Sequence, residues 1–374
     1  MSWLVALAIA GCGGDESPGS SGAGGTGQAG SGGSAGEGGT ASGAGGVGGA
    51  GGAGASGGAG GEATVPWLAG VNLAGAEFGE SHLPGIYDTH YTYPTEAEVD
   101  YFVGKGMNAI RLPFRWERLQ PALNQPFDST ELGRLDGFVS YAAGQGAWVI
   151  LDPHNYARYH GDLIGDGTVS ADDFADFWRR LAEHYAGQPK AVFGLMNEPH
   201  DMTTELWLAD ANAAIAAIRT AGASNLVLVP GNGWTGAHSW DGSYYGTPNA
   251  DVMGGVVDPL GHFAFEMHQY LDSDSSGTSD VCVSATIGSE RMQAATTWLR
   301  QHGNLGFLGE FGGARNQTCY DAIDDLVTYL EDNDDVWIGW AYWAAGPWWQ
   351  DYMFTLEPDG SQDRPQMDVL EGHL

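Results

Sequence analysis

Basic residues are scarce in this chain. Its 374 residues include 14 lysines and arginines against 47 aspartates and glutamates, and the formal net charge is −33. Proteins that bind nucleic acid or anionic membrane surfaces do so through basic patches that displace counterions. The shortage of positive charge therefore excludes nucleic acid and a directly bound membrane surface as partners, and it suits an uncharged substrate.

No apolar segment is long enough to cross a bilayer, and the apolar residues 3–10 are too few to do so. They lead into Ile9-Ala10-Gly11-Cys12, which resembles the lipobox of bacterial lipoproteins, although no basic residue precedes it. We therefore expect residues 1–12 to be a lipoprotein-type signal segment with Cys12 lipidated. The lipid alone would hold the exported protein at the cell surface or outer membrane. A cleaved signal peptide that releases a secreted protein is the alternative.

Cysteine is rare as well, with three residues in the chain. Apart from Cys12, these are Cys282 and Cys319, and both follow expected strands. In an exported protein, two such cysteines favour one disulfide. Two unrelated buried thiols are the alternative.

Motifs of metal-dependent and serine hydrolases are missing from residues 64–374, which contain neither His-Glu-x-x-His nor Gly-x-Ser-x-Gly. The segment that begins at Asp272 has Asp at positions one and three and Gly at position six, as a calcium loop does. Its twelfth residue is Val283 rather than the glutamate that such a loop needs. We expect neither a metal ion nor a cofactor.

Glycine, in contrast, dominates one segment. Of the 49 residues from 13 to 61, 25 are glycine, and most of the others are alanine or serine. Such a composition buries too little apolar surface to offset the entropy lost on ordering the chain. We expect residues 13–63 to be a disordered tether and residues 64–374 to be one folded domain.

Eight short apolar segments alternate with helical patterns in residues 64–374. The expected strands are 67–75, 109–114, 148–154, 192–196, 226–230, 263–270, 306–311 and 336–343. Thr95 with Glu98, and Ser170, are expected to cap two of the helices. Apolar strands separated by helices form parallel sheets. Because polar residues end nearly every strand and no glycine fingerprint follows the first, we predict an α/β fold of the (β/α)8 TIM barrel type rather than a doubly wound sheet.

Two carboxylates lie at the ends of buried strands. Glu198 follows the apolar run at 192–196, where Pro199 favours an extended backbone for the residue before it. Glu310 ends the run that begins at Gly306. The carboxyl ends of the strands of a parallel barrel meet on one face. A pair of carboxylates placed in this way is what glycoside hydrolysis requires.

Polar or aromatic residues also end the other strands, and they are Arg111, His154, Asn197, His268, Tyr270 and Trp343. Each has a structural explanation by itself, such as a buried ion pair or a core histidine. Glu266, His268 and Tyr270 alternate with apolar residues, so they share one face of their strand, as in a buried hydrogen-bond network. The recurrence of such residues on strand after strand favours an active site.

Taken together, the motifs resemble glycoside hydrolase family 5. They are Arg111-Leu-Pro, Asp152-Pro-His154-Asn-Tyr, Met196-Asn-Glu-Pro-His200, His268-Gln-Tyr270 and Gly309-Glu310-Phe. The segments 231–234 and 271–278 are similar to its secreted endoglucanase subfamily. The resemblance implies a (β/α)8 fold, retention of configuration, Glu198 as acid/base and Glu310 as nucleophile. It also implies that the six other strand-end residues line the subsite where the bond is cut.

Physical chemistry gives these residues compatible roles. Arg111 and the Tyr270 hydroxyl would favour the ionised form of a nucleophile. Asn197, next to Glu198, would donate to the sugar 2-hydroxyl. Trp343 offers a flat surface for a sugar ring. The candidates for outer subsites are Trp234, Trp240, Trp348 and Trp349, and core packing is the alternative for each of them.

We therefore expect an exported, monomeric, retaining endo-β-1,4-glucanase that acts on cellulose-type chains. An endo-β-mannanase or a mixed-linkage β-glucanase of the same fold is the nearest alternative, because strand ends set the mechanism while loops select the sugar. A non-catalytic carbohydrate-binding lipoprotein is a more distant alternative, and the presence of both carboxylates speaks against it.

Overall fold

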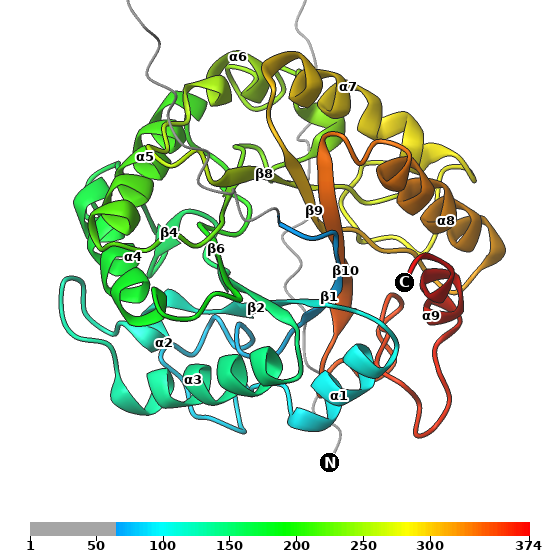
Figure 1. The fold of residues 1–374 in the computed structure, drawn as a ribbon, viewed down its shortest axis with the longest axis horizontal. Coiled ribbons are helices and arrows are strands. Elements are labelled where there is room, and N and C mark those ends of the chain that lie inside the picture. The colour runs from blue at the N-terminus through cyan, green and yellow to red at the C-terminus, as the bar shows by residue number, and fades with distance from the viewer. Residues whose placement is uncertain (1–64) are drawn as a thin grey trace, which may run out of the picture. The chain divides into compact units, whose positions relative to one another are not determined.

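The computed structural model describes residues 65–374. Within them, eight parallel strands close into a barrel in the order β1-β10-β9-β8-β7-β6-β3-β2, and the helices surround it (Figure 1). The predicted (β/α)8 barrel is thus confirmed. The expected signal segment 1–12 with Cys12, and the expected tether 13–63, lie outside the described residues.

The barrel strands agree with the predicted segments to within a few residues. They are β1 (Leu68–Leu73), β2 (Ala109–Phe114), β3 (Trp148–Pro153), β6 (Ala191–Gly194), β7 (Val227–Pro230), β8 (Phe263–His268), β9 (Gly306–Glu310) and β10 (Trp337–Ala345). A small hairpin follows β3 and consists of β4 (Arg158–Tyr159) and β5 (Asp162–Leu163).

Six longer helices cover the barrel: α1 (Glu96–Gly104), α3 (Ser129–Gly144), α4 (Ala171–Tyr185), α5 (Thr204–Thr220), α7 (Ile287–His302) and α8 (Gln317–Glu331). The shorter ones are α2 (Trp116–Leu119), η1 (Ala237–Ser239), α6 (Asn249–Val252), η2 (Met253–Gly255), α9 (Pro365–Leu370) and η3 (Glu371–His373). Among residues 65–374, none of the helices combines the length and apolar composition needed to cross a membrane.

Both predicted helix caps are present. At the start of α1, Thr95 and Glu98 form a capping box, in which the Thr95 backbone N–H donates to Glu98 Oε2 at 2.5 Å. At the start of α4, Ser170 Oγ accepts from the Asp173 backbone N–H at 3.1 Å. These caps satisfy backbone donors that a helix leaves unpaired at its first turn.

The barrel interior has two layers of different polarity. Successive side chains of a strand point to opposite faces, so residues two apart share the interior face. Ala109 and Ala264 belong to an apolar interior cluster that also contains Leu68, Ile150, Val192, Leu228, Phe307 and Ala341. Two positions further along their strands lie the buried polar residues Arg111, Asp152 and Glu266. The apolar layer therefore supports a polar layer nearer the carboxyl ends of the strands.

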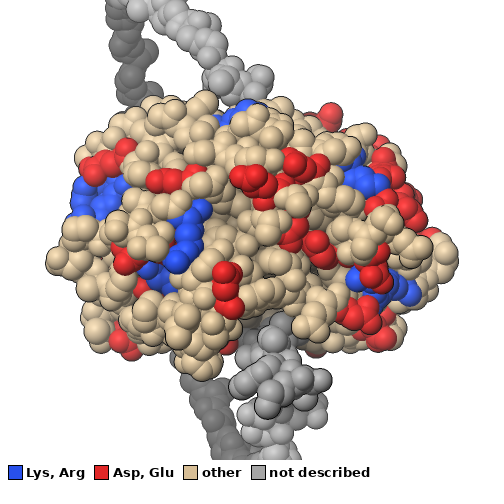
Figure 2. All heavy atoms as spheres, turned by 90° about the horizontal axis from the view of Figure 1, so that it is seen from below, with Lys and Arg blue, Asp and Glu red and all other residues tan. Residues whose placement is uncertain are grey.

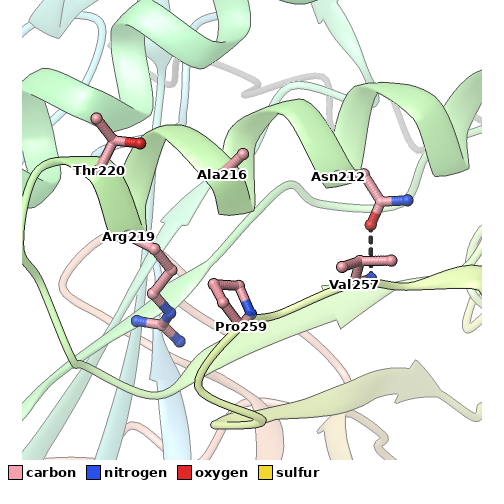
Figure 3. A pocket seen from close by; sticks show the side chains of 6 residues that line it. All are labelled: Asn212, Ala216, Arg219, Thr220, Val257 and Pro259. Atoms are coloured by element: carbon pink, nitrogen blue, oxygen red, sulfur yellow. Dashed lines mark hydrogen bonds between the residues drawn. The ribbon is translucent and has the colours of Figure 1, made fainter.

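The segment between β7 and β8 differs from the prediction. A helical pattern was expected there, but the structure has only the short η1, α6 and η2. Without a long helix at this position, Val257 and Pro259 line an open hollow of about 550 Å³ together with the α5 residues Asn212, Ala216, Arg219 and Thr220 (Figure 3). Because Pro259 precedes β8, the hollow lies towards the amino ends of the strands. Arg219 is paired there with Asp258 at 2.8 Å.

Acidic side chains are spread over the domain surface, and Figure 2 shows basic side chains lying beside them on one side of the barrel. Arg179, for example, contacts Asp176 and Glu183 at 2.7 Å each. Solvent screens exposed pairs of this kind, so each contributes only about 0–1 kcal/mol to stability.

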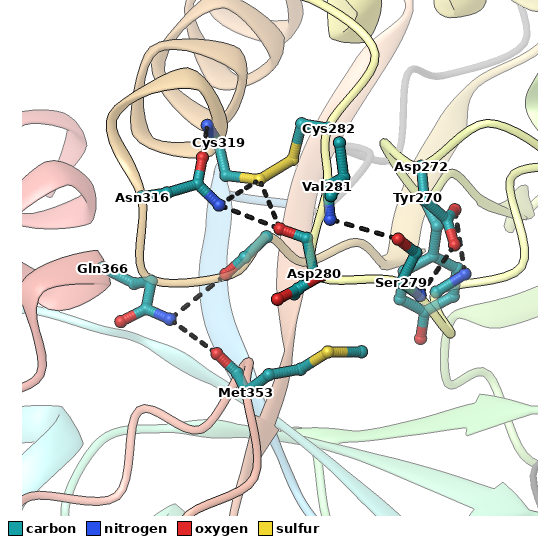
Figure 4. Close-up of a disulfide and its surroundings, with 12 residues drawn as sticks. Tyr270, Asp272, Ser279, Asp280, Val281, Cys282, Asn316, Cys319, Met353 and Gln366 are labelled. Carbon is teal, nitrogen blue, oxygen red and sulfur yellow. Dashed lines mark hydrogen bonds between the residues drawn. A yellow bond between two sulfur atoms is a disulfide. The ribbon is translucent and has the colours of Figure 1, made fainter.

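Cys282 and Cys319 form a disulfide with a Cα–Cα distance of 5.3 Å, which confirms the predicted pairing. The bridge joins the loop after β8 to the first turn of α8 (Figure 4). The same loop is ordered by Asp272, whose carboxylate accepts from the backbone N–H groups of residues 277, 278 and 279. A covalent link and a buried carboxylate therefore hold the segment that follows the end of β8.

Replacing both cysteines with serine should lower the free energy of unfolding by about 3–4 kcal/mol, because the bridge closes a long loop in the unfolded chain. Urea titration of the two proteins measures this difference. In a background with Cys12→Ala, the denatured protein should contain no free thiol before reduction. After reduction it should contain two free thiols. Two thiols before reduction would rule out the bridge.

Candidate active site

The predicted strand-end residues converge at the carboxyl end of the barrel. They are Arg111 on β2, His154 after β3, Asn197 and Glu198 after β6, His268 on β8, Tyr270 after it, Glu310 on β9 and Trp343 on β10. Contacts link all of them into one cluster. The convergence follows from the parallel barrel, in which every strand ends on the same face.

Arg111 lies at the centre of this cluster, and its side chain is fully buried. Its Nη1 donates to Glu310 Oε1 at 2.8 Å, and its Nη2 donates to Asn197 Oδ1 at 2.8 Å. The guanidinium also forms ion pairs with Glu266 at 2.8 Å and Asp152 at 3.1 Å. Burial by itself would lower the pKa of Arg111, but the three carboxylates outweigh it and raise that pKa, so the group stays charged.

Glu310 is held at both of its oxygens. Arg111 donates to Oε1, and the Tyr270 hydroxyl donates to Oε2 at 2.7 Å. Burial raises the pKa of the Glu310 carboxyl above its ordinary value, and the positive charges of His268 and Arg111 offset part of that rise. The two donors and the two cations thus act against burial and favour the ionised form that a nucleophile needs.

His268 lies between the two glutamates. Its Nδ1 is 2.8 Å from Glu198 Oε1 and 3.6 Å from Glu310 Oε2, and its Nε2 is 3.3 Å from Glu266 Oε1. Burial alone would lower the pKa of His268, but the carboxylates of Glu310, Glu198 and Glu266 raise it to about 10. The ring is therefore an imidazolium at neutral pH and donates from both nitrogens.

Glu198 does not lie on the strand itself. The structure ends β6 at Gly194, two residues before the predicted end, and Glu198 follows in an irregular segment. Its φ is +42°, so the predicted extended backbone is wrong. A residue before proline avoids the right-handed helical region, and Glu198 adopts the uncommon left-handed one while its side chain contacts His268 at 2.8 Å. The side chain is 16% exposed against 5% for Glu310, so Glu198 faces the more open side of the site.

A second chain of contacts orients Asn197. Burial lowers the pKa of His154 to about 3, so this ring is neutral. Its Nδ1 lies 2.8 Å from Asp152 Oδ2, and its Nε2 lies 3.1 Å from Asn197 Nδ2. A neutral ring that donates to Asp152 must accept from the Asn197 amide. With Arg111 donating to Asn197 Oδ1, the amide has one possible orientation.

Of the predicted aromatic platforms, Trp343 and Trp234 are partly exposed. Trp343 stacks on His154 with ring centroids 5.5 Å apart, and its peptide bond to Ala344 is cis. Trp234 lies flat on His200 at 4.3 Å and meets the edge of Tyr245 at 5.1 Å. Both indoles are therefore held in fixed orientations by neighbouring rings.

The other platform candidates divide differently. Trp240 is fully buried against Phe265 and Trp298, so its proposed outer-subsite role is wrong. Trp349 is also buried and packs on Trp343, which makes it a support for that ring rather than a sugar platform. Trp348 remains partly exposed. The burial of an indole depends on packing between distant segments, which spacing in the sequence does not reveal.

The structure adds Asn72, Asp152 and Glu266 to the predicted site. All three are buried and contact Arg111 directly. Asn72 also donates to the Gly309 carbonyl at 2.9 Å. The alternation of Glu266 with His268 predicts that both lie on one face of the strand. The contact of Glu266 with Arg111 on β2, across the barrel, has no signal in the sequence.

Glu198, His268 and Glu310 present donor atoms that all lie within 4.8 Å of one another, a spacing that suits a metal ion. A metal ligand must offer a lone pair, so histidine binds metal as the neutral ring. Because the raised pKa of His268 keeps both of its nitrogens protonated, this group is better suited to acid–base chemistry than to metal binding.

Comparison with known proteins places this geometry in a family. The profile described as Cellulase (glycosyl hydrolase family 5) matches residues 70–346. Endo-beta-1,4-glucanase A of Emericella nidulans is 48% identical over 294 residues, which are 78% of this chain and 87% of that protein. Among solved structures, the endo-beta-1,4-glucanase Xac0029 from Xanthomonas axonopodis pv. citri has a TM-score of 0.80 at 48% identity, covering 82% of this chain and 97% of that one. XacCel5A in complex with cellopentaose has a TM-score of 0.81 at 47% identity, covering 83% and 100%. The chain therefore belongs to glycosyl hydrolase family 5.

Proposed function

We propose that this protein is an exported endo-β-1,4-glucanase that cuts internal bonds of cellulose-type β-glucans with retention of configuration. The observation that carries the proposal is the close placement of Glu198 and Glu310, which have carboxylate oxygens within 4.8 Å of one another. Retaining glycosidases need carboxyl groups about 5–5.5 Å apart, whereas inverting enzymes need roughly 6.5–9.5 Å to admit a water molecule. The spacing supports the retaining pathway.

In the first half-reaction, Glu310 acts as the nucleophile. Its carboxylate forms an ester bond to the anomeric carbon while the bond from that carbon to the glycosidic oxygen breaks. Glu198 gives its proton to the departing oxygen, so the leaving chain departs as a neutral alcohol. Arg111 and Tyr270, with one donor on each oxygen of Glu310, hold the attacking carboxylate in position.

In the second half-reaction, Glu198 acts as the base. It takes a proton from a water molecule, whose oxygen attacks the anomeric carbon and releases Glu310 as a carboxylate. Two inversions at this carbon give a β-product. Asn197 gives one amide hydrogen to His154, which leaves the other for the sugar 2-hydroxyl, where a hydrogen bond strengthens in the transition state.

The choice of glucan rests on the relatives and on the aromatic rings. The similar proteins are named as endo-beta-1,4-glucanases, and one solved relative holds cellopentaose. In this chain, Trp343 would carry the sugar ring next to the cleaved bond, and Trp234 would carry a ring on the side of Glu198. Stacking on such faces is non-ionic and suits a neutral polymer.

Release of reducing ends from carboxymethylcellulose and barley β-glucan should exceed release from mannan by at least about tenfold, since loops that fit one sugar epimer reject another by a few kcal/mol. Parallel assays at equal polymer mass measure the ratio. A large preference for mannan would establish the mannanase alternative, and activity on barley β-glucan alone would favour the mixed-linkage enzyme.

Export is part of the proposal, because the Cys282–Cys319 bridge is of a type that persists in oxidising compartments. We further propose that Cys12 carries a lipid and that residues 13–63 tether a monomeric domain to the membrane. Cys12→Ala should then move the enzyme from the membrane fraction to the soluble fraction, without change in its specific activity. If the two proteins fractionate equally, the proposed lipid anchor is wrong and the alternative of a secreted enzyme stands.

Alanine substitution separates the roles of the two glutamates. Glu310→Ala should abolish turnover of every substrate, because no leaving group compensates for a missing nucleophile. Glu198→Ala should reduce polymer hydrolysis by about 10²–10⁴-fold, the usual contribution of a general acid, but spare the first step on aryl cellobiosides whose phenolate needs no proton. Added azide should restore turnover in Glu198→Ala and yield a β-glycosyl azide.

Glu290→Ala, at an exposed glutamate on α7, is the matched control and should retain wild-type rates. An α-configured azide product from Glu198→Ala, or an α-anomer from the wild type, would reverse the assignment. If the wild-type protein binds cello-oligosaccharides but does not hydrolyse them, the alternative of a non-catalytic carbohydrate-binding protein is correct.

A further inference from the structure

Glu266 is a buried carboxylate without a step in the mechanism above. Its side chain on β8 is 2% exposed, and its Oε1 lies 2.8 Å from Arg111 Nε and 3.3 Å from His268 Nε2. A Cβ on Gly309 would come within 2.3 Å of the same oxygen, so a glycine on β9 leaves the space that this carboxylate fills. Burial raises the pKa of Glu266, but the positive charges of Arg111 and His268 outweigh it and lower the pKa, so the group is an anion.

His268 is surrounded by carboxylates on three sides. Glu198 approaches from the segment after β6, Glu310 from β9 and Glu266 from within β8. The guanidinium of the same cluster, Arg111 on β2, is itself paired with Glu266 and Glu310. Of the three anions, Glu266 is the one that faces Nε2, while the others face Nδ1. Its charge therefore helps to hold a second proton on the ring, and its oxygen accepts from Nε2.

The proton on Nδ1 matters for Glu198. When His268 donates from Nδ1 to Glu198 Oε1, that oxygen is an acceptor, and the acidic proton of Glu198 must be on Oε2. The oxygen of residue 266 that faces Arg111 Nε also faces His268 Nε2 and can only accept, so a neutral ring would keep its one proton on Nε2. Nδ1 would then accept from Glu198 Oε1 instead. The catalytic proton would then be drawn toward the histidine and away from the glycosidic oxygen.

We propose, building on the function proposed above, that Glu266 is a positioning residue that keeps His268 a donor at both ring nitrogens and so holds the catalytic proton on Oε2 of Glu198. Glu266 acts through His268 and contacts no reacting atom. Its pairing with Arg111 fixes the carboxylate in place from the opposite side of the barrel.

Glu266→Gln preserves the size of the side chain and removes its charge, and its effect should depend on the leaving group. For phenyl β-cellobioside, whose phenolate needs a proton, kcat/KM should fall by about 10- to 100-fold, within the range that a general acid contributes. For 2,4-dinitrophenyl β-cellobioside the fall should stay below about threefold, since this phenolate departs unprotonated. A KM that stays near the wild-type value would place the loss in the proton transfer rather than in binding.

Asp152→Asn is the matched control. Asp152 is also a buried carboxylate paired with Arg111, but it contacts His154 rather than His268. Any loss that arises from disturbing Arg111 should appear in this variant and be equal for both aryl cellobiosides. If Glu266→Gln likewise loses equally on both substrates, the inference is wrong and Glu266 serves Arg111 alone.

Histidine ring NMR tests the same point without a rate. In the wild type, the His268 signals, assigned by their loss in His268→Asn, should show two ring N–H groups and no titration between about pH 5 and pH 9. In Glu266→Gln, the ring should begin to lose a proton within that range. Should this variant fail to fold, the wild type still decides, because a His268 ring that titrates near the ordinary histidine pKa overturns the inference.

Glu198→Ala separates this inference from the function on which it rests. If Glu198→Ala shows no dependence on the leaving group, the proposed acid itself is wrong. If Glu198→Ala shows that dependence and Glu266→Gln does not, the glucanase mechanism stands and the role of Glu266 alone is refuted.

Discussion

The buried charge of Arg111 is the interaction on which the rest of the site depends. A guanidinium removed from water costs several kcal/mol unless it is paired, and breaking such a pair costs about 3–5 kcal/mol because the remaining charge stays buried. Three carboxylates and two amide oxygens surround this side chain from β1, β3, β8, β9 and the segment after β6. Strand ends from most of the barrel are thus bound to one cation. Their geometry is fixed before any substrate arrives, as catalysis by oriented groups requires.

This arrangement is possible because the barrel interior has an apolar layer that stabilises the fold and a separate polar layer that carries the site. The apolar cluster around Ile150 and Phe307 fills the interior below, where side chains pack without charge. Two residues further along the same strands, the interior positions change to Asp152 on β3 and Gly309 on β9. Glycine at Gly309 gives up packing volume, which the Glu266 carboxylate takes. Polar residues that would destabilise a uniform core therefore lie where their partners reach them from neighbouring strands.

Features of the fold and the site that depend on local sequence were predictable, whereas those that depend on contacts between distant segments were not. Strands were found from runs of apolar residues, and their polar ends indicated the site, because both signals are local. Burial of Trp240 and the left-handed backbone of Glu198 depend on segments far away in the sequence, so local pattern predicted both wrongly. The helical pattern predicted between β7 and β8 is also wrong, because only the short η1, α6 and η2 lie there. Glu266 was seen on the correct strand face, but its pairing with Arg111 becomes visible only when the barrel is closed.

The placement of His268 also bears on how one site serves two opposite proton transfers. Before reaction, its positive charge lies 2.8 Å from Glu198 and 3.6 Å from Glu310. In the proposed mechanism, Glu310 becomes an ester and loses its negative charge. Glu198 gives up its proton in the same step and becomes negatively charged. The negative charge facing Nδ1 therefore moves from one glutamate to the other, and the imidazolium remains opposite a carboxylate in both states. Glu266 stays ionised in both steps, so His268 keeps both ring protons between them. The proton that is transferred is therefore the one on Glu198, which changes from acid to base.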